Sequence, residues 1–288
     1  MKKVFRIIHL GLALLYLVLA SIYSSAFAAK VDTVKVFSKA MNKEVPAVII
    51  TPKSYQVSKG LPVLYLLHGY SDDHKKWVNT VPSIKELADK YNIIIVCPDG
   101  GYGSWYLDSP ILKGHKYETF ISTELVDFID KNYKTNPHKE GRAITGLSMG
   151  GHGALLNAIN HSEKYACAGS LSGAVNLLFE SDKDNSLKDL KKDISLKLGD
   201  ISSSRLAWQA HSIVYLIDKI KAANLPIAID CGVYDFLIED NRTLHKKLLQ
   251  ANVSHDYTER PGVHDWSYWA NAIEYQVLFF SRIVQAKK

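Results

Sequence analysis

The chain has 288 residues, of which 47% are hydrophobic and 22% charged, so it can bury the core of one large domain. Its formal net charge is +6 at pH 7, and three of the positive charges belong to Lys2, Lys3 and Arg6. The remaining residues carry little net charge, with acids and bases interspersed, which excludes a nucleic-acid-binding surface and a strong attraction to anionic membranes.

The first residues predict a secretory signal peptide. The three basic residues precede an apolar run over 7–20, and a stretch of small residues ends in Ala26-Phe27-Ala28. This order of basic, apolar and small residues is typical of a cleaved export signal. A membrane anchor is the alternative, because the apolar run approaches the length of a span. We expect cleavage after Ala28, no stable membrane anchor, and a single domain over 29–288 exported to the periplasm or the medium.

Strands and helices then alternate along the chain. Eight apolar runs rich in Val and Ile predict strands, at 31–37, 45–50, 62–67, 93–97, 142–145, 166–171, 226–231 and 254–259. From the third strand onward they alternate with segments of helical periodicity, at 83–91, 118–133, 153–160, 213–223, 241–251 and 266–285. This alternation predicts an α/β fold with a mostly parallel, eight-stranded sheet and helices on both faces.

Residues 174–211 interrupt the alternation. They lie between two predicted strands, exceed the length that one crossover helix requires, and carry mixed charge from Asp182 to Asp200. We expect a small cap insertion over the carboxyl edge of the sheet, where such folds bind ligands. A solvated surface excursion is the alternative.

The cysteines indicate neither disulfides nor a metal site. Each of Cys97, Cys167 and Cys231 lies in an apolar run that predicts a strand, so we expect three buried free thiols. No Cys/His spacing of the zinc type occurs. The cysteine spacing therefore predicts no zinc site.

The strand predicted at 142–145 leads into Gly146-Leu147-Ser148-Met149-Gly150-Gly151, and a helical pattern follows at once. This is the strand, sharp turn and helix of a nucleophile elbow, the hallmark of the α/β-hydrolase fold. The turn requires Gly146 and Gly150 because side chains there would collide. Ser148 is therefore the predicted nucleophile.

A serine nucleophile needs a base and an acid that orients the base, and this fold places them in the order Ser, acid, His. His264 follows the last predicted strand and precedes the last helix, which predicts it as the base. Asp235 lies in the loop after the preceding strand and is the predicted acid. Asp230, inside that strand, is its competitor.

The loop after the third predicted strand should complete an oxyanion hole. One backbone N–H comes from Met149, the residue after the nucleophile, and the other from Tyr70, with Gly69 allowing close approach. We expect His68 to brace this loop. Trp105 and Tyr106 are predicted to contribute to an aromatic rim that contacts substrate.

These motifs resemble the esterase D-like branch of the α/β hydrolases, which includes S-formylglutathione hydrolases, tributyrin esterases, feruloyl and acetyl xylan esterases, and bacterial mycolyltransferases. The resemblance covers nearly all of 29–288. It rests on His68-Gly69 with Trp77, 103–106 with Asp108-Ser109, 146–151, 231–237, and 261–266 with Tyr268-Trp269. It implies Ser148, Asp235 and His264 as the catalytic residues, Tyr70 and Met149 as oxyanion donors, and ester hydrolysis without metal or cofactor.

The expected function is a secreted serine carboxylesterase that acts on small-molecule or polysaccharide-linked esters with short or hydroxycinnamoyl acyl groups. The export signal departs from the cytosolic formylglutathione hydrolases and suits the polysaccharide esterases. The polar character of 174–211 argues against long acyl chains. An acyltransferase of the mycolyltransferase type is the main alternative, and a non-catalytic binding protein is the alternative from another class.

Overall fold

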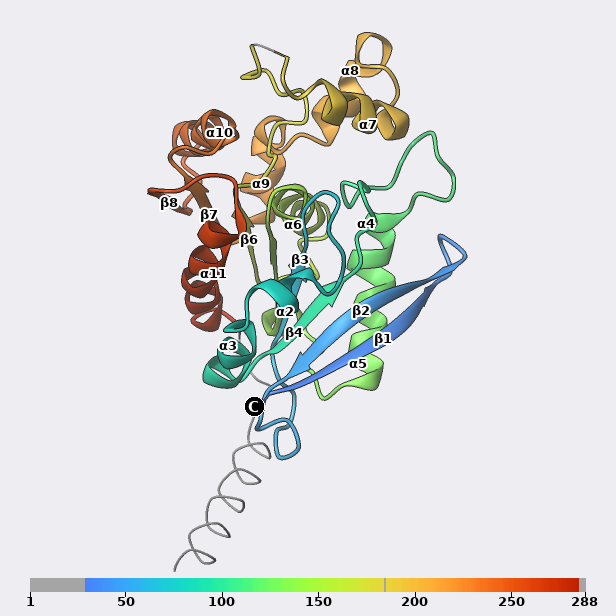
Figure 1. The fold of residues 1–288 in the computed structure, drawn as a ribbon, viewed down its shortest axis with the longest axis vertical. Helices are drawn as coiled ribbons and strands as arrows, with labels where there is room; N and C mark the ends of the chain where they lie inside the picture. The colour runs from blue at the N-terminus through green and yellow to red at the C-terminus, as the bar shows by residue number, and fades with distance from the viewer. Residues whose placement is uncertain (1–28, 184, 285–288) are drawn as a thin grey trace, which may run out of the picture.

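The computed structural model describes residues 29–183 and 185–284, so the predicted signal peptide at 1–28 lies outside the described residues. The described chain contains one sheet in the order β1-β2-β4-β3-β5-β6-β7-β8 (Figure 1). Its strands are β1 Lys30–Ser38, β2 Lys43–Thr51, β3 Val63–Leu67, β4 Ile94–Pro98, β5 Arg142–Gly146, β6 Cys167–Leu171, β7 Ile227–Gly232 and β8 Asp256–Arg260. All eight predicted strands are confirmed, each within two residues of its predicted bounds.

The sheet is mostly parallel, as predicted. The pairs β1–β2 and β2–β4 are antiparallel, whereas β4, β3, β5, β6, β7 and β8 run parallel to one another. The carboxyl ends of these parallel strands therefore meet at one edge of the sheet, which is where the loops after β3, β5, β7 and β8 come together.

Helices connect the strands. The described helices are α2 Lys76–Thr80, α3 Ile84–Tyr91, α4 Tyr117–Thr119, α5 Leu125–Asn132, α6 Met149–Asn160, α7 Lys188–Leu198, α8 Ile201–Ala210, α9 Ile217–Ala223, α10 Ile238–Gln250 and α11 Trp266–Ser281. A π-helical turn, Phe120–Glu124, joins α4 to α5. Each predicted helical segment contains a helix, whereas the short α2 was not predicted.

The core lies on both faces of the sheet. In β3, Val63, Tyr65 and Leu67 belong to one hydrophobic cluster, which includes residues of α5 and α6. Leu64 and Leu66 belong to a second cluster, which includes residues of α3 and α11. All five residues of β3 are buried, because helices cover both faces of the strand.

The segment 174–211 contains α7 and α8, which lie at the top of Figure 1 above α4 and α6. Two hydrogen bonds join α7 to the loop after β4. The indole Nε1 of Trp105 donates to Asp193 Oδ2 at 2.9 Å, and Ser109 Oγ donates to the carbonyl oxygen of Lys197 at 2.6 Å. We call residues 174–211 the inserted segment below.

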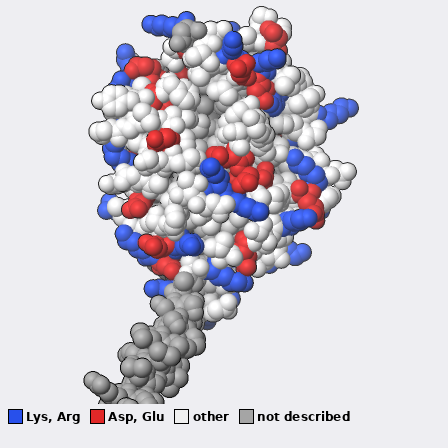
Figure 2. All heavy atoms as spheres, in the orientation of Figure 1, with Lys and Arg blue, Asp and Glu red and all other residues white. Residues whose placement is uncertain are grey.

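The three cysteines are buried and free, as predicted. On the face drawn in Figure 2, basic and acidic side chains are interspersed, and no continuous basic patch covers the described residues there. Among the described helices, none combines the length and the hydropathy needed to cross a bilayer.

Candidate active site

Ser148 lies in a strained turn between β5 and α6. Its φ is 53° and its ψ is −116°, a combination that residues other than glycine rarely adopt. A Cβ atom on Gly146 would lie 2.7 Å from the carbonyl carbon and oxygen of Gly150. A Cβ atom on Gly150 would lie 2.6 Å from the carbonyl oxygen of Leu67. The two glycines therefore permit the turn that presents Ser148, as the sequence argument required.

Three loops bring Ser148, His264 and Asp235 together. Nε2 of His264 lies 2.9 Å from Oγ of Ser148, and Nδ1 lies 2.9 and 2.8 Å from the two carboxylate oxygens of Asp235. The Asp235 side chain is fully buried, and the backbone N–H of Leu237 donates to its Oδ1 at 2.9 Å. Because the carboxylate accepts a hydrogen bond from Nδ1–H, the free electron pair of the neutral imidazole is on Nε2 and faces the serine hydroxyl.

Asp230, the competing acid, belongs to a separate group of side chains. It is buried within β7, where Arg260 and the hydroxyl of Tyr268 donate to its carboxylate. Burial raises the pKa of Asp230, against the effect of these two donors. Both of its oxygens are therefore occupied by partners other than His264.

Two aromatic rings flank the imidazole of His264. The ring centroid of Phe236 lies 4.4 Å from that of His264, and the Trp269 ring meets it edge-on at 4.9 Å. Trp269 is buried, whereas Phe236 is half-exposed. Phe236 was not predicted as a site residue, although it directly follows Asp235 in the sequence.

The loop after β3 lies against the nucleophile. A Cβ atom on Gly69 would be 3.7 Å from Cβ of Ser148, which places the backbone of this loop beside the serine. Within the described chain, the backbone N–H groups of Tyr70 and Met149 donate no hydrogen bond to another protein group. Met149 also opens α6, where unpaired N–H groups attract negative charge. Both predicted oxyanion donors are thus unpaired within the described residues.

His68 braces this loop. The backbone N–H of Gly100 donates to its Nε2 at 2.7 Å, so Nε2 is the acceptor and Nδ1 carries the proton donated to the carbonyl oxygen of Gly69 at 2.8 Å. Burial lowers the pKa of His68, which favours this neutral form. His68 therefore ties the loop after β3 to the loop after β4, as expected.

The aromatic rim differs from the expectation. Trp105 and Tyr106 are 1% and 0% exposed, so neither ring forms an open platform. The hydroxyl of Tyr106 donates to the carbonyl oxygen of His68 at 3.1 Å, and its ring packs so closely on Gly153 that a Cβ atom there would lie 2.5 Å away. Tyr106 thus has a structural position beneath the loop. The exposed ring in this neighbourhood is Tyr102, which packs against Tyr70 at 5.0 Å.

The polar groups of the site suit acyl transfer. Among the residues that the structure describes, no three His, Cys, Asp or Glu side chains are grouped to hold a metal ion. A nucleophile, a base, an orienting acid and two free N–H groups are the parts that acyl transfer requires.

Comparison with known proteins identifies the family. The family described as putative esterase matches residues 38–280. An acetyl esterase of Caldicellulosiruptor saccharolyticus is 31% identical over 257 residues, which cover 83% of this chain and 95% of that protein. A diacylglycerol acyltransferase/mycolyltransferase Ag85A of Mycobacterium gordonae is 29% identical over 250 residues, covering 74% of this chain and 70% of that protein.

Solved structures agree with the fold. A ferulic acid esterase superposes with a TM-score of 0.76 at 30% identity, covering 90% of this chain and 100% of that one. The α/β-hydrolase fold predicted from the sequence is therefore confirmed. The chain belongs to the putative esterase family, in its esterase D-like branch, and is an esterase.

Proposed function

We propose that this protein is an exported serine carboxylesterase that cleaves short-chain or hydroxycinnamoyl esters, including esters on polysaccharide, through an acyl-Ser148 intermediate. The observation that carries the proposal is the continuous hydrogen-bonded series from Ser148 through His264 to the buried Asp235. The two free backbone N–H groups beside it supply the complementary site for a developing oxyanion.

In the acylation half, Oγ of Ser148 attacks the ester carbonyl carbon while its proton moves to Nε2 of His264. The resulting imidazolium is stabilised by Asp235, and the oxyanion accepts hydrogen bonds from the N–H groups of Tyr70 and Met149. When the tetrahedral intermediate collapses, Nε2 returns the proton to the departing alkoxide oxygen. The alcohol leaves, and the acyl group remains on Ser148.

In the deacylation half, a water molecule gives a proton to Nε2 of His264 and attacks the acyl carbon. The second tetrahedral intermediate expels Oγ of Ser148, which regains the proton from Nε2, and the carboxylic acid is released. The same base thus serves both halves, and the enzyme returns to its starting state.

The substrate class follows from the surroundings of the serine and from the relatives. The inserted segment, expected to be a cap, carries the mixed charges of α7, which disfavour contact with a long acyl chain. An acetyl esterase and a ferulic acid esterase are among the proteins that the chain resembles. Export rests on the basic, apolar and small-residue pattern of residues 1–28.

Acyl transfer is the second candidate, supported by the 29% identity to a diacylglycerol acyltransferase/mycolyltransferase. A transferase differs from a hydrolase in which nucleophile reaches the acyl-enzyme. Incubation with an ester and a sugar or alcohol acceptor distinguishes them: free acid as the main product supports the hydrolase, and transfer product in excess supports the transferase.

The test of the hydrolase is a panel of nitrophenyl acyl esters, methyl ferulate and acetylated xylan. Ser148→Ala should lower kcat by roughly four to six orders of magnitude and abolish labelling by a fluorophosphonate. Ser267→Ala, which changes an exposed serine on α11, is the matched control and should retain full activity and labelling. If Ser148→Ala kept more than a few per cent of the activity, Ser148 would not be the nucleophile.

A further inference from the structure

Asp193 reaches from the inserted segment to the loop beside the candidate oxyanion hole. Its Oδ2 accepts the indole N–H of Trp105 at 2.9 Å, across 88 positions of sequence. Gly103 lies against the same carboxylate, because a Cβ atom on it would be 2.9 Å from Oδ2 and 2.7 Å from the ring of Tyr70. Burial and the nearby Asp193 carboxylate raise the pKa of Tyr70. Asp193 therefore lies close to both Trp105 and Tyr70.

Trp105 in turn borders both predicted oxyanion residues. Its ring centroid lies 6.1 Å from that of Tyr70, and its backbone N–H donates to Sδ of Met149 at 3.4 Å. The loop of Tyr70 is also tied to this region, since the N–H of Ser71 donates to the carbonyl oxygen of Tyr102 at 2.7 Å. A shift of Trp105 would thus disturb side-chain contacts of both Tyr70 and Met149.

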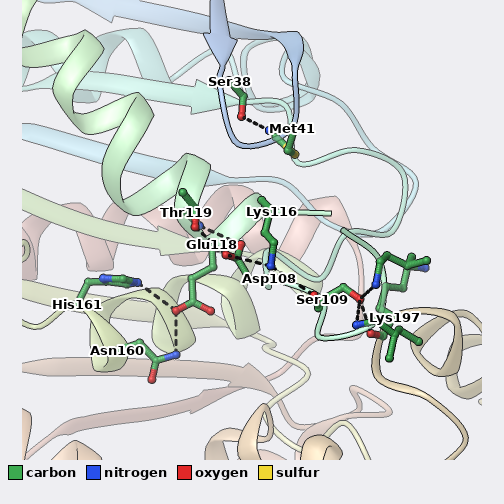
Figure 3. Close-up of polar contacts among 12 residues, drawn as sticks. Ser38, Met41, Asp108, Ser109, Lys116, Glu118, Thr119, Asn160, His161 and Lys197 are labelled. Atoms are coloured by element: carbon green, nitrogen blue, oxygen red, sulfur yellow. Dashed lines mark hydrogen bonds and ion pairs between the residues drawn. The ribbon is translucent and has the colours of Figure 1, made fainter. Parts of the chain in front are cut away.

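The Asp193 carboxylate is itself held in place. Nζ of Lys197, one helical turn later, lies 2.5 Å from Oδ1 and 2.9 Å from the carbonyl oxygen of Asp193. Ser109, in the loop after β4, donates from Oγ to the carbonyl oxygen of Lys197, as Figure 3 shows. Oδ1 is therefore occupied by Lys197, and Oδ2 is left to receive Trp105. The backbone of Trp105 has a φ of 57° and is therefore strained. The hydrogen bond from its indole to Asp193 helps to hold the residue in this conformation.

We propose that Asp193 is a positioning residue of the esterase site, which fixes Trp105 and through it the backbone donors of Tyr70 and Met149. This inference rests on the proposed function and deepens it, because it gives a residue of the inserted segment a role in positioning the oxyanion donors. Oxyanion donors act when they are preorganised, so a small displacement weakens the stabilisation of the transition state more than the binding of substrate.

The experiment compares Asp193→Ala, Asp193→Asn, Trp105→Phe and the double variant Asp193→Ala/Trp105→Phe. Asp193→Ala removes the acceptor, and Trp105→Phe removes the donor while retaining a ring. Each should lower kcat by about tenfold, the scale of one lost hydrogen bond to a charged group, with KM within about threefold of wild type. The double variant should be no slower than the slower single variant, because both changes remove the same bond.

Asp193→Asn should recover most of the activity, since its amide oxygen can still accept from Trp105. Asp189→Ala is the matched control: it removes the same charge from an exposed position on α7 and should leave kcat unchanged. Rates are expressed per active site titrated with a fluorophosphonate, so a partly unfolded variant lowers the titre and leaves kcat per titrated site unaltered.

A kcat per titrated site within twofold of wild type in both Asp193→Ala and Trp105→Phe would overturn the inference. So would an equal loss in Asp189→Ala, which would indicate a general effect of charge. Failure of the proposed function is a different result, namely activity retained by Ser148→Ala or no ester hydrolysis by wild type.

Discussion

The replacement of Asp235 by Asn tests the orientation of His264 most directly. The N–H of Leu237 donates to Oδ1 of Asp235, so the amide oxygen of an Asn side chain takes this position. The –NH₂ group then occupies the position of Oδ2, 2.8 Å from Nδ1 of His264. The amide oxygen, at the Oδ1 position 2.9 Å from Nδ1, remains a weaker acceptor for the Nδ1 proton, whereas the –NH₂ group can only donate to Nδ1. The substitution therefore favours the tautomer in which Nδ1 accepts and the imidazole proton is on Nε2.

With the proton on Nε2, His264 cannot accept the proton of Ser148. The expected loss in kcat is about 10⁴-fold, equivalent to roughly 5.5 kcal/mol in the activation barrier. The fold should persist, because Asp and Asn have nearly the same shape. The measurement is kcat on nitrophenyl butyrate, with the thermal unfolding midpoint recorded for each variant.

Asp230→Asn is the matched control, because Asp230 lies in β7 and Asp235 lies in the loop that follows β7. It weakens the contacts with Arg260 and Tyr268, so the free energy of unfolding should fall by about 2 kcal/mol while kcat stays within about threefold. An Asp235→Asn variant with more than a tenth of wild-type kcat would show that Asp235 does not control the orientation of His264. Equal losses of kcat in Asp235→Asn and Asp230→Asn would show that neither residue alone is the acid that orients His264.

Three further predictions concern specificity and stability. Catalytic efficiency on nitrophenyl acetate or butyrate should exceed that on the palmitate ester by at least about tenfold. Equal efficiency from the acetate to the palmitate ester would contradict the expectation that the polar inserted segment disfavours long acyl chains. The hydrogen bond from His161 to Glu118, drawn in Figure 3, raises the pKa of His161, although burial opposes it. Its stabilising effect is complete below the unfolded pKa and is lost as pH rises through the raised folded value. His161→Gln should therefore lower the unfolding free energy by about 1 kcal/mol near pH 6 and by much less near pH 9, measured by urea denaturation. Burial raises the pKa of the three thiols, so iodoacetamide should modify them only after denaturation, and rapid alkylation of the native protein would contradict their burial.

The strands and the meeting of the three loops were predictable because burial and topology determine them. A parallel strand covered on both faces, such as β3, is a continuous apolar run that the sequence displays directly. Since parallel strands end at one edge, the residues that follow β5, β7 and β8 must come together there. The positions of Ser148, Asp235 and His264 follow from that rule, while their catalytic roles stay predictions.

Contacts between distant segments were not predictable in the same way. The run Gly103-Ser104-Trp105-Tyr106 shows that large rings are present, but their direction depends on partners far along the chain. Trp105 is held by Asp193, and the hydroxyl of Tyr106 by His68. Similarly, α2 has five residues with one buried side chain, Trp77, which is too few for a helical period to emerge.

The backbone conformation of Ser148 affects how the stability of this protein can be raised by mutation and selection. A non-glycine residue held at a φ of 53° and a ψ of −116° costs about 1–3 kcal/mol of folding free energy. Glycine at that position would relieve the strain and give a more stable protein that lacks the predicted nucleophile. We therefore expect selection for thermostability or expression alone to enrich glycine variants at position 148 that lack activity, so directed evolution of this enzyme must screen for turnover in every round.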